Sequence, residues 1–228
     1  YDDVSTTLKS ADFSRDVEKY STQATSESRQ RRREMQRERT KSILNLDPPD
    51  HTRLRRIVSK SFTPSAMEKL RGRIEQLVNT VLDTAQERGS IELIDDLAFP
   101  VPFQVISDLL AMPTERAEEM REWSQIITNS LEPTATDEEL AQSDDAVAQL
   151  VPYLTSIIED RRKHLGDDML SSLITAEEAG DKMTTDELMA FLVLLYIAGH
   201  ETTVNLIGNS TLALLRHPDQ AELVHQHG

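Results

Sequence analysis

Residues 184–203 read TTDELMAFLVLLYIAGHETT, and this stretch decides the fold. Thr184 and Glu187 have the spacing of a capping box, which predicts that a helix begins at Thr184. Every residue from Leu188 to Ala198 is apolar, and a helix that is apolar on all sides is buried on all sides. We therefore predict a long helix that runs to about Arg216 through the interior of a mostly α-helical protein.

The apolar run does not predict a membrane span. It is far shorter than the ~20 residues that a span needs, and the polar residues His200, Glu201 and Asn205 follow it at once. The sequence opens on a polar, acidic stretch without the pattern of a signal peptide. It contains no cysteine, which excludes disulfides and zinc–thiolate sites and is typical of cytosolic proteins. We predict a cytoplasmic protein with no membrane partner.

The middle of the long helix departs from its own apolar pattern, because it carries the small or polar residues Gly199, His200, Glu201, Thr202 and Thr203. Such departures usually mark a site. Thr202 can return its hydroxyl to the carbonyl of Ala198 and bend the helix. Gly199 has no Cβ, so a flat ligand can approach the backbone there. Glu201 beside Thr202 places an acid next to a hydroxyl, which predicts a proton relay.

A second motif, DPPDHTRLRR, occupies residues 47–56. Its prolines predict a helix start, and Asp50 is well placed to cap that helix. His51 and Arg55 are four residues apart on one helix face, so both can bind the same anion. Each such charge-assisted contact contributes on the order of 1.5–3 kcal/mol when it is shielded from water. The alternative is that both side chains pair with neighbouring acids on an exposed helix.

These two motifs, in this order, resemble those of the cytochrome P450 superfamily, the haem-thiolate monooxygenases, and of its soluble bacterial type in particular. Residues 198–203 resemble the oxygen-binding motif of the family's central helix. The resemblance implies that Glu201 and Thr202 are catalytic and pass protons to the bound dioxygen. It also assigns three residues of the same motif to the haem face: Ala198, Gly199 and Thr203.

The earlier motif resembles the segment of the family that binds the haem propionates. By this resemblance, His51 and Arg55 hold haem b. The outward-facing basic residues nearby would help to dock an acidic, ferredoxin-like electron donor: Arg53, Arg56 and Lys60. The other implied partners are molecular oxygen and a small organic substrate that is hydroxylated or epoxidised. Neither a membrane nor a nucleic acid is an expected partner.

One departure from the family pattern concerns the iron ligand. The family's iron is held by a cysteine thiolate, and this sequence contains no cysteine. We therefore expect residues 1–228 to form a single domain that is the central fragment of a P450, truncated at both ends. It would extend from the family's second helix to just past the long central helix, with the axial cysteine outside it. Such a fragment would be inactive alone.

The remaining pattern predicts further elements around the central helix. Helices are expected over Tyr1–Ser10, Pro100–Leu110, Glu115–Leu131, Asp137–His164 and Asp167–Ala179. The helix after Pro64 carries one apolar stripe and ends at Gly89, so we expect it to pack on the core. Ile91 to Ile94 reads as a short strand or an extended link, and Pro152 as an irregularity in its helix.

Two other functions have some support in the sequence. His200-Glu201 opens like the zinc-peptidase pattern H-E-x-x-H, but Val204 occupies the position of the second histidine, which argues against zinc. The segment Arg29–Arg73 holds 14 Lys and Arg against 5 Asp and Glu in a chain of net charge −15. An all-α protein that uses Arg29–Lys41 to bind nucleic acid or an acidic protein is therefore the alternative.

Overall fold

The computed structural model describes residues 2–10, 12–14, 16, 42–113, 115–132, 134–178 and 183–227. These residues form helices joined by short turns, without a strand among them, which confirms the mostly α class. The Arg29–Lys41 segment lies outside the described residues, so the structure offers nothing for the alternative function. The bounds of the elements are α1 (Asp2–Lys9), η1 (Ile43–Asn45), α4 (Asp50–Ser59), α5 (Pro64–Arg88), η2 (Leu93–Ala98), α6 (Pro100–Leu109), α7 (Ala117–Asn129), α8 (Asp137–Lys163), α9 (Met169–Glu178), α10 (Thr185–Arg216) and α11 (Pro218–His227).

The central helix α10 begins as the sequence predicts. The backbone N–H of Glu187 donates to Thr184 Oγ1 at 3.1 Å, and the backbone N–H of Thr184 donates to Glu187 Oε2 at 2.7 Å. This reciprocal pair satisfies backbone donors that have no partner inside the helix. The helix continues to Arg216, which confirms the predicted extent.

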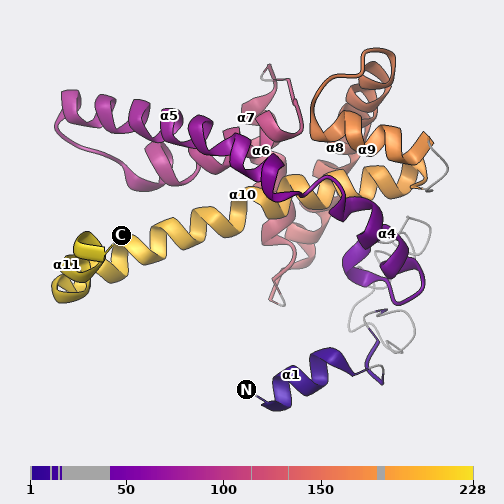
Figure 1. Ribbon diagram of the computed structural model, residues 1–228, viewed down its shortest axis with the longest axis horizontal. Coiled ribbons are helices and arrows are strands. Elements are labelled where there is room, and N and C mark those ends of the chain that lie inside the picture. The colour runs from indigo at the N-terminus through magenta and orange to yellow at the C-terminus, as the bar shows by residue number, and fades with distance from the viewer. Residues whose placement is uncertain are drawn as a thin grey trace.

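Helix α10 runs along the long axis of the molecule, with α7, α8 and α9 around its first half (Figure 1). Its buried residues end at Val204: Leu188, Phe191, Leu192, Tyr196, His200 and Val204. Beyond that point Leu206 and Leu215 are 67% and 77% exposed. The prediction of a helix buried on all sides is therefore wrong. In the first half one face is buried while Leu194 is partly covered and Ala198 is exposed, and in the second half fewer described elements cover the helix.

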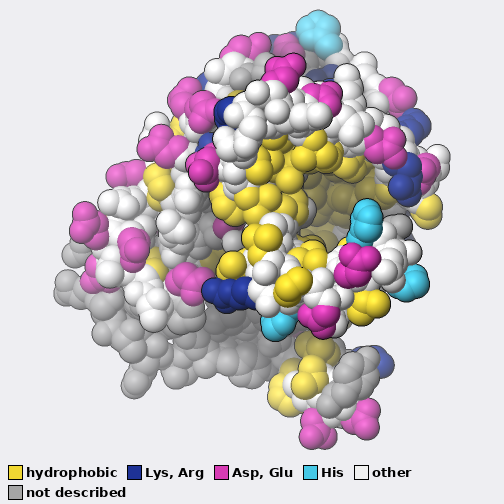
Figure 2. Space-filling view, turned by 90° about the vertical axis from the view of Figure 1, so that its left-hand side faces the viewer, with side chains coloured by type: hydrophobic (Ala, Val, Ile, Leu, Met, Phe, Trp, Pro, Cys, Tyr) yellow, Lys and Arg dark blue, Asp and Glu magenta, His cyan; other side chains and the backbone are white. Residues whose placement is uncertain are grey.

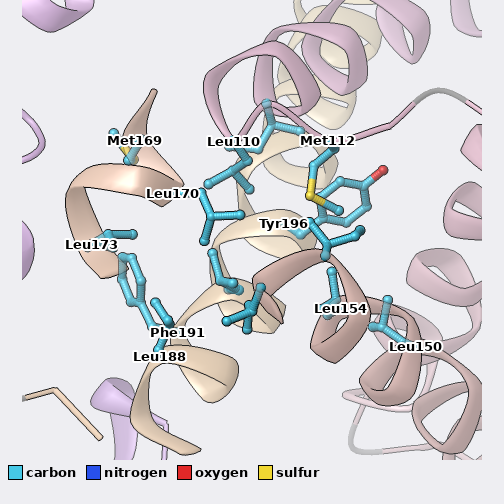
Figure 3. Close-up of a cluster of buried hydrophobic side chains, with 14 of the residues drawn as sticks. Leu110, Met112, Leu150, Leu154, Met169, Leu170, Leu173, Leu188, Phe191 and Tyr196 are labelled. Carbon is cyan, nitrogen blue, oxygen red and sulfur yellow. The ribbon is translucent and has the colours of Figure 1, made fainter. Parts of the chain in front are cut away.

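The core lies where α10 meets α6, α7, α8 and α9 (Figure 3). Leu150 and Leu154 of α8 and Leu170 and Leu173 of α9 are almost completely buried there. Helix α9 follows α8 after a short link and contacts both α8 and α10. Burial of one Leu side chain stabilises a fold by about 1.5–3 kcal/mol, so this cluster holds the first half of α10 in place.

Three local predictions fail wholly or in part. The residue before α4 is Pro49, and the Asp50 side chain does not cap the helix, because Asp50 already lies inside the first turn. The prediction of a strand or extended link over Ile91–Ile94 holds only for its first half: Glu92 is extended, but the π-helical turn η2 begins at Leu93. Helix α8 continues through Pro152 without interruption.

Helix α5 ends at Gly89, whose φ of +74° is the left-handed conformation that glycine adopts at low cost. Its apolar stripe is not buried, however. Met67, Ile74 and Leu82 are exposed, and the other described members are only partly covered. Because α5 packs against α6 and η2 on one side only, the expectation that the whole stripe joins the core is wrong for this structure.

Candidate active site

The predicted oxygen-binding motif lies at the end of the buried half of α10. Ala198 and Thr202 are exposed on one face of the helix, while Glu201 and Thr203 are partly covered and His200 is buried. Thr202 Oγ1 donates a hydrogen bond to the carbonyl oxygen of Ala198 at 3.0 Å. This is the return bond that the sequence predicts, and it fixes the direction of the hydroxyl.

Glu201 has a neighbour that the sequence reading did not assign to the site. Asn205 Nδ2 donates to Glu201 Oε1 at 3.3 Å, one helical turn along α10. The spacing of Glu201 and Asn205 in the sequence predicts this contact, because residues four apart on a helix lie on one face. Asn205 thus holds the carboxylate in a defined direction beside the open face of the helix.

Gly199 has a packing role in this structure. A Cβ built on Gly199 would lie 2.9 Å from Cδ1 and 3.0 Å from Cγ1 of Ile106, on α6. The missing side chain therefore allows α6 and α10 to approach each other closely. That Gly199 also lies against a flat ligand stays a prediction, since the direction open to a side chain here faces α6.

His200 is the polar residue on the buried side of the motif, and it has no solvent exposure. Its Nδ1 lies 2.8 Å from the carbonyl oxygen of Tyr196, and its Nε2 lies 2.8 Å from Ser124 Oγ on α7. The rings of Phe99, Phe103 and Tyr196 meet the imidazole edge to face. Burial lowers the pKa of His200 despite the opposing effect of the Tyr196 carbonyl, so the neutral ring is favoured.

The propionate-type motif lies on α4. His51 is partly exposed and Arg55 is exposed, one turn apart on the same helix face. Within the described part of the chain, neither side chain has a hydrogen bond or ion pair. The alternative that neighbouring acids occupy both groups is therefore not supported. A histidine and an arginine without partners on one face fit the two carboxylates of a haem.

Arg53 does not have the outward-facing position that the docking prediction gave it. It forms an ion pair with Glu187 at the start of α10, and its Nη1 lies 3.4 Å from Glu187 Oε2. Burial raises the pKa of Glu187, but hydrogen bonds from Arg53 and from the Thr184 backbone outweigh it, so the net pKa is lowered. Arg53 therefore ties α4 to α10, whereas Arg56 and Lys60, further along the chain, are exposed.

One end of the molecule presents a hollow lined by hydrophobic side chains (Figure 2). Helix α5 and the second half of α10 both extend toward this end (Figure 1). The exposed large hydrophobic residues of these elements and of η2 and α11 include Leu82, Ile94, Leu206, Leu212, Leu215 and Leu223. Among the described residues, no group of three His, Cys, Asp or Glu side chains is arranged to hold a metal ion.

Comparison with known proteins places this geometry in a family. The family model for cytochrome P450 matches residues 4–227. Cytochrome P450 107B1 of Saccharopolyspora erythraea is 46% identical over 178 residues, which are 78% of this chain and 42% of that protein. Cytochrome P450 CYP107DY1 of Priestia megaterium is 37% identical over 98% of this chain and 55% of its own length.

A solved structure agrees. The crystal structure of the myxobacterial cytochrome P450 CYP267B1 in complex with myristic acid superimposes with a TM-score of 0.86 at 37% identity, covering 99% of this chain and 55% of that one. The chain belongs to the cytochrome P450 family, and its relatives are bacterial P450 enzymes that use haem b. It spans about half the length of these relatives, and it contains no cysteine to ligate the haem iron.

Proposed function

We propose that the complete protein is a monooxygenase that hydroxylates or epoxidises a small organic substrate with molecular oxygen. The observation that carries this proposal is the open face of α10, where Ala198 and Thr202 are exposed and the Thr202 hydroxyl is held by the helix backbone. Membership in the P450 family supports the class of chemistry. The substrate depends on residues that line the access route, and these two motifs do not specify it.

Haem b, when bound, supplies the activation of dioxygen that the reaction requires. His51 and Arg55 would hold its two propionates from α4. Ala198, Gly199 and Thr203 would border its face on α10. Because residues 1–228 include no cysteine for the iron, we expect this polypeptide, as a central piece of one P450 domain, to have no monooxygenase activity alone.

The proton relay follows from the geometry of Thr202 and Glu201. The Thr202 hydroxyl donates its hydrogen to the Ala198 carbonyl, so its oxygen lone pairs remain to accept a hydrogen bond from the open face. Glu201, held by Asn205, can supply a proton from the adjacent position. Together they would deliver protons at the Oγ1 atom of Thr202.

Thr202→Ala in the complete, haem-loaded protein tests the relay. We expect the fraction of reducing equivalents recovered in product to fall, with the rest appearing as hydrogen peroxide, because the hydroxyl that orders the relay is lost. Ser210→Ala is the matched control, since Ser210 makes the same kind of return bond to Leu206 two turns further along α10. Unchanged coupling in Thr202→Ala would exclude the relay role.

The double variant His51→Ala with Arg55→Ala tests the cofactor assignment. Loss of both contacts should weaken haem retention, measured as the rate of haem transfer to an acceptor protein such as apomyoglobin. Thr52→Ala, on an exposed neighbouring position of α4, serves as the control. Haem transfer at the same rate from the double variant and the parent protein would remove both residues from the site.

We further propose that a ferredoxin-like donor docks near Arg56 and Lys60, which are exposed on α4. Arg53 is unsuited to this role, because it is paired with Glu187. Charge reversal at Arg56 and Lys60 should reduce the rate of electron transfer most at low ionic strength.

Although α10 is long and apolar enough to cross a membrane by length and composition, its first half forms the core, so we propose a cytoplasmic protein that needs neither a membrane nor a nucleic acid.

A further inference from the structure

We propose that His200 is a positioning residue, whose hydrogen bond with Ser124 of α7 sets the rotation of α10 at the motif and so directs Thr202 and Glu201 toward the open face. This inference rests on the function proposed for Thr202 and Glu201. The proton relay does not use His200, although His200 is the most completely buried polar residue of the motif.

The hydrogen-bond directions around His200 follow from chemistry. A backbone carbonyl can only accept, so Nδ1 of His200 carries the proton that it donates to the Tyr196 oxygen at 2.8 Å. In the neutral ring Nε2 is then the acceptor, and the Ser124 hydroxyl donates to it at 2.8 Å. One tautomer satisfies both contacts, so the ring has a defined orientation within α10 and a defined partner on α7.

This bond controls rotation in a way that the surrounding apolar contacts cannot. Apolar packing is non-directional, so the contacts of His200 with Phe99 and Phe103 constrain the rotation of α10 less sharply than a hydrogen bond does. A hydrogen bond weakens steeply when its angle departs from linearity. The contact of Gly199 with Ile106 sets how close α10 lies to α6, while the bond from Ser124 sets which residues of α10 face α7.

Helical geometry carries the effect to the reactive side. His200 and Thr202 are two residues apart, about 200° around the helix axis, so one faces the core while the other faces the open side. A rotation of about 20° would displace a side-chain tip roughly 5 Å from the axis by about 1.7 Å. Displacements of about 1 Å at reacting groups can lower rates by about 10²-fold.

The decisive variants are Ser124→Ala and the double variant Ser124→Ala with His200→Phe, in the complete haem-loaded protein. Ser124→Ala leaves the buried Nε2 without its donor, which destabilises the fold. The double variant replaces both partners with apolar groups of similar shape, which can be nearly neutral for stability. We expect the thermal unfolding midpoint to recover in the double variant, while coupling to product stays about three- to tenfold below that of the parent.

Ser143→Ala is the matched control. Ser143 is also fully buried and accepts a hydrogen bond from Ser130 at 2.9 Å, but it joins the end of α7 to α8 and not to α10. Ser143→Ala should lower the thermal unfolding midpoint and leave the coupling of electron transfer to product unchanged. Parental coupling in the double variant would overturn the inference, as would a loss of coupling in Ser143→Ala equal to that in Ser124→Ala.

A second readout does not depend on turnover. Backbone hydrogen exchange in residues 198–206 should be faster in Ser124→Ala and in the double variant than in Ser143→Ala, because only the first two release α10 from α7. Equal exchange in the three proteins would also overturn the inference. If Thr202→Ala leaves coupling intact, the proposed relay fails; if Thr202→Ala uncouples the enzyme and the double variant does not, only the positioning role of His200 fails.

Discussion

The two halves of α10 differ in their surroundings far more than in their local structure. From Leu188 to Val204 one face of the helix packs against four other helices, whereas Leu206, Leu212 and Leu215 are exposed in the second half. Both halves continue the same regular helix. The difference shows that an apolar pattern identifies a face that can be buried, while burial itself depends on which other elements are present to cover it.

The largest expected effect separates the two halves directly. Leu188→Ala, at a position with no exposure, should lower the free energy of unfolding by about 2–5 kcal/mol, because it leaves a cavity in the core. Leu215→Ala, at a position 77% exposed, should change it by no more than about 0.5 kcal/mol. Denaturant unfolding of both variants measures the contrast, and similar losses would mean that the second half is also packed.

A smaller effect is expected at the boundary between the halves. Gly199→Ala places a methyl group 2.9 Å from Cδ1 of Ile106, so overpacking should cost about 1–3 kcal/mol, less the gain of up to about 1 kcal/mol from a better helix former. Gly72→Ala is the control on α5, where nothing lies within 4 Å of the added Cβ. It should stabilise the protein slightly. Stabilisation by both substitutions would show that the contact with α6 is loose.

The smallest effect concerns the first turn of α10 and depends on pH. Glu187→Gln keeps a side chain that can complete the capping box but removes the charge facing Arg53, so we expect a loss of up to about 1 kcal/mol at pH 7. The folded-state pKa of Glu187 is lowered, so its contribution is present above the unfolded value of about 4.3 and is lost as pH falls through the folded pKa.

Unfolding free energies of the parent and Glu187→Gln at a series of pH values between about 7 and 3 test this prediction. The two curves should converge at the acid end. Glu68→Gln is the control, because Glu68 pairs with Arg71 one turn away on the surface of α5, where both side chains are well exposed. A pH-independent difference for Glu187→Gln would indicate that the charge of Glu187 does not stabilise the fold.

Much of the fold could be predicted because its signals are local. The capping box of Thr184 and Glu187, the end of α5 at Gly89 and the return bond of Thr202 to Ala198 each involve residues within one helical turn. The errors have a different origin. Asp50 has the chemistry of a cap but lies one residue inside the helix, and boundaries of this kind depend on how the preceding turn is held.

For the candidate site, residue types and spacing were enough to find the motif on α10 and the pair His51 and Arg55 on α4. They could not show that Arg53 pairs with a residue 134 positions away or that His200 meets a serine on α7. The sequence by itself determined most of the helices, the cap of α10 and the residue types of the site, because hydrogen bonds within one turn follow from local spacing. Only the tertiary structure decided which faces are buried and which charges are paired, because contacts between distant residues form only when helices pack.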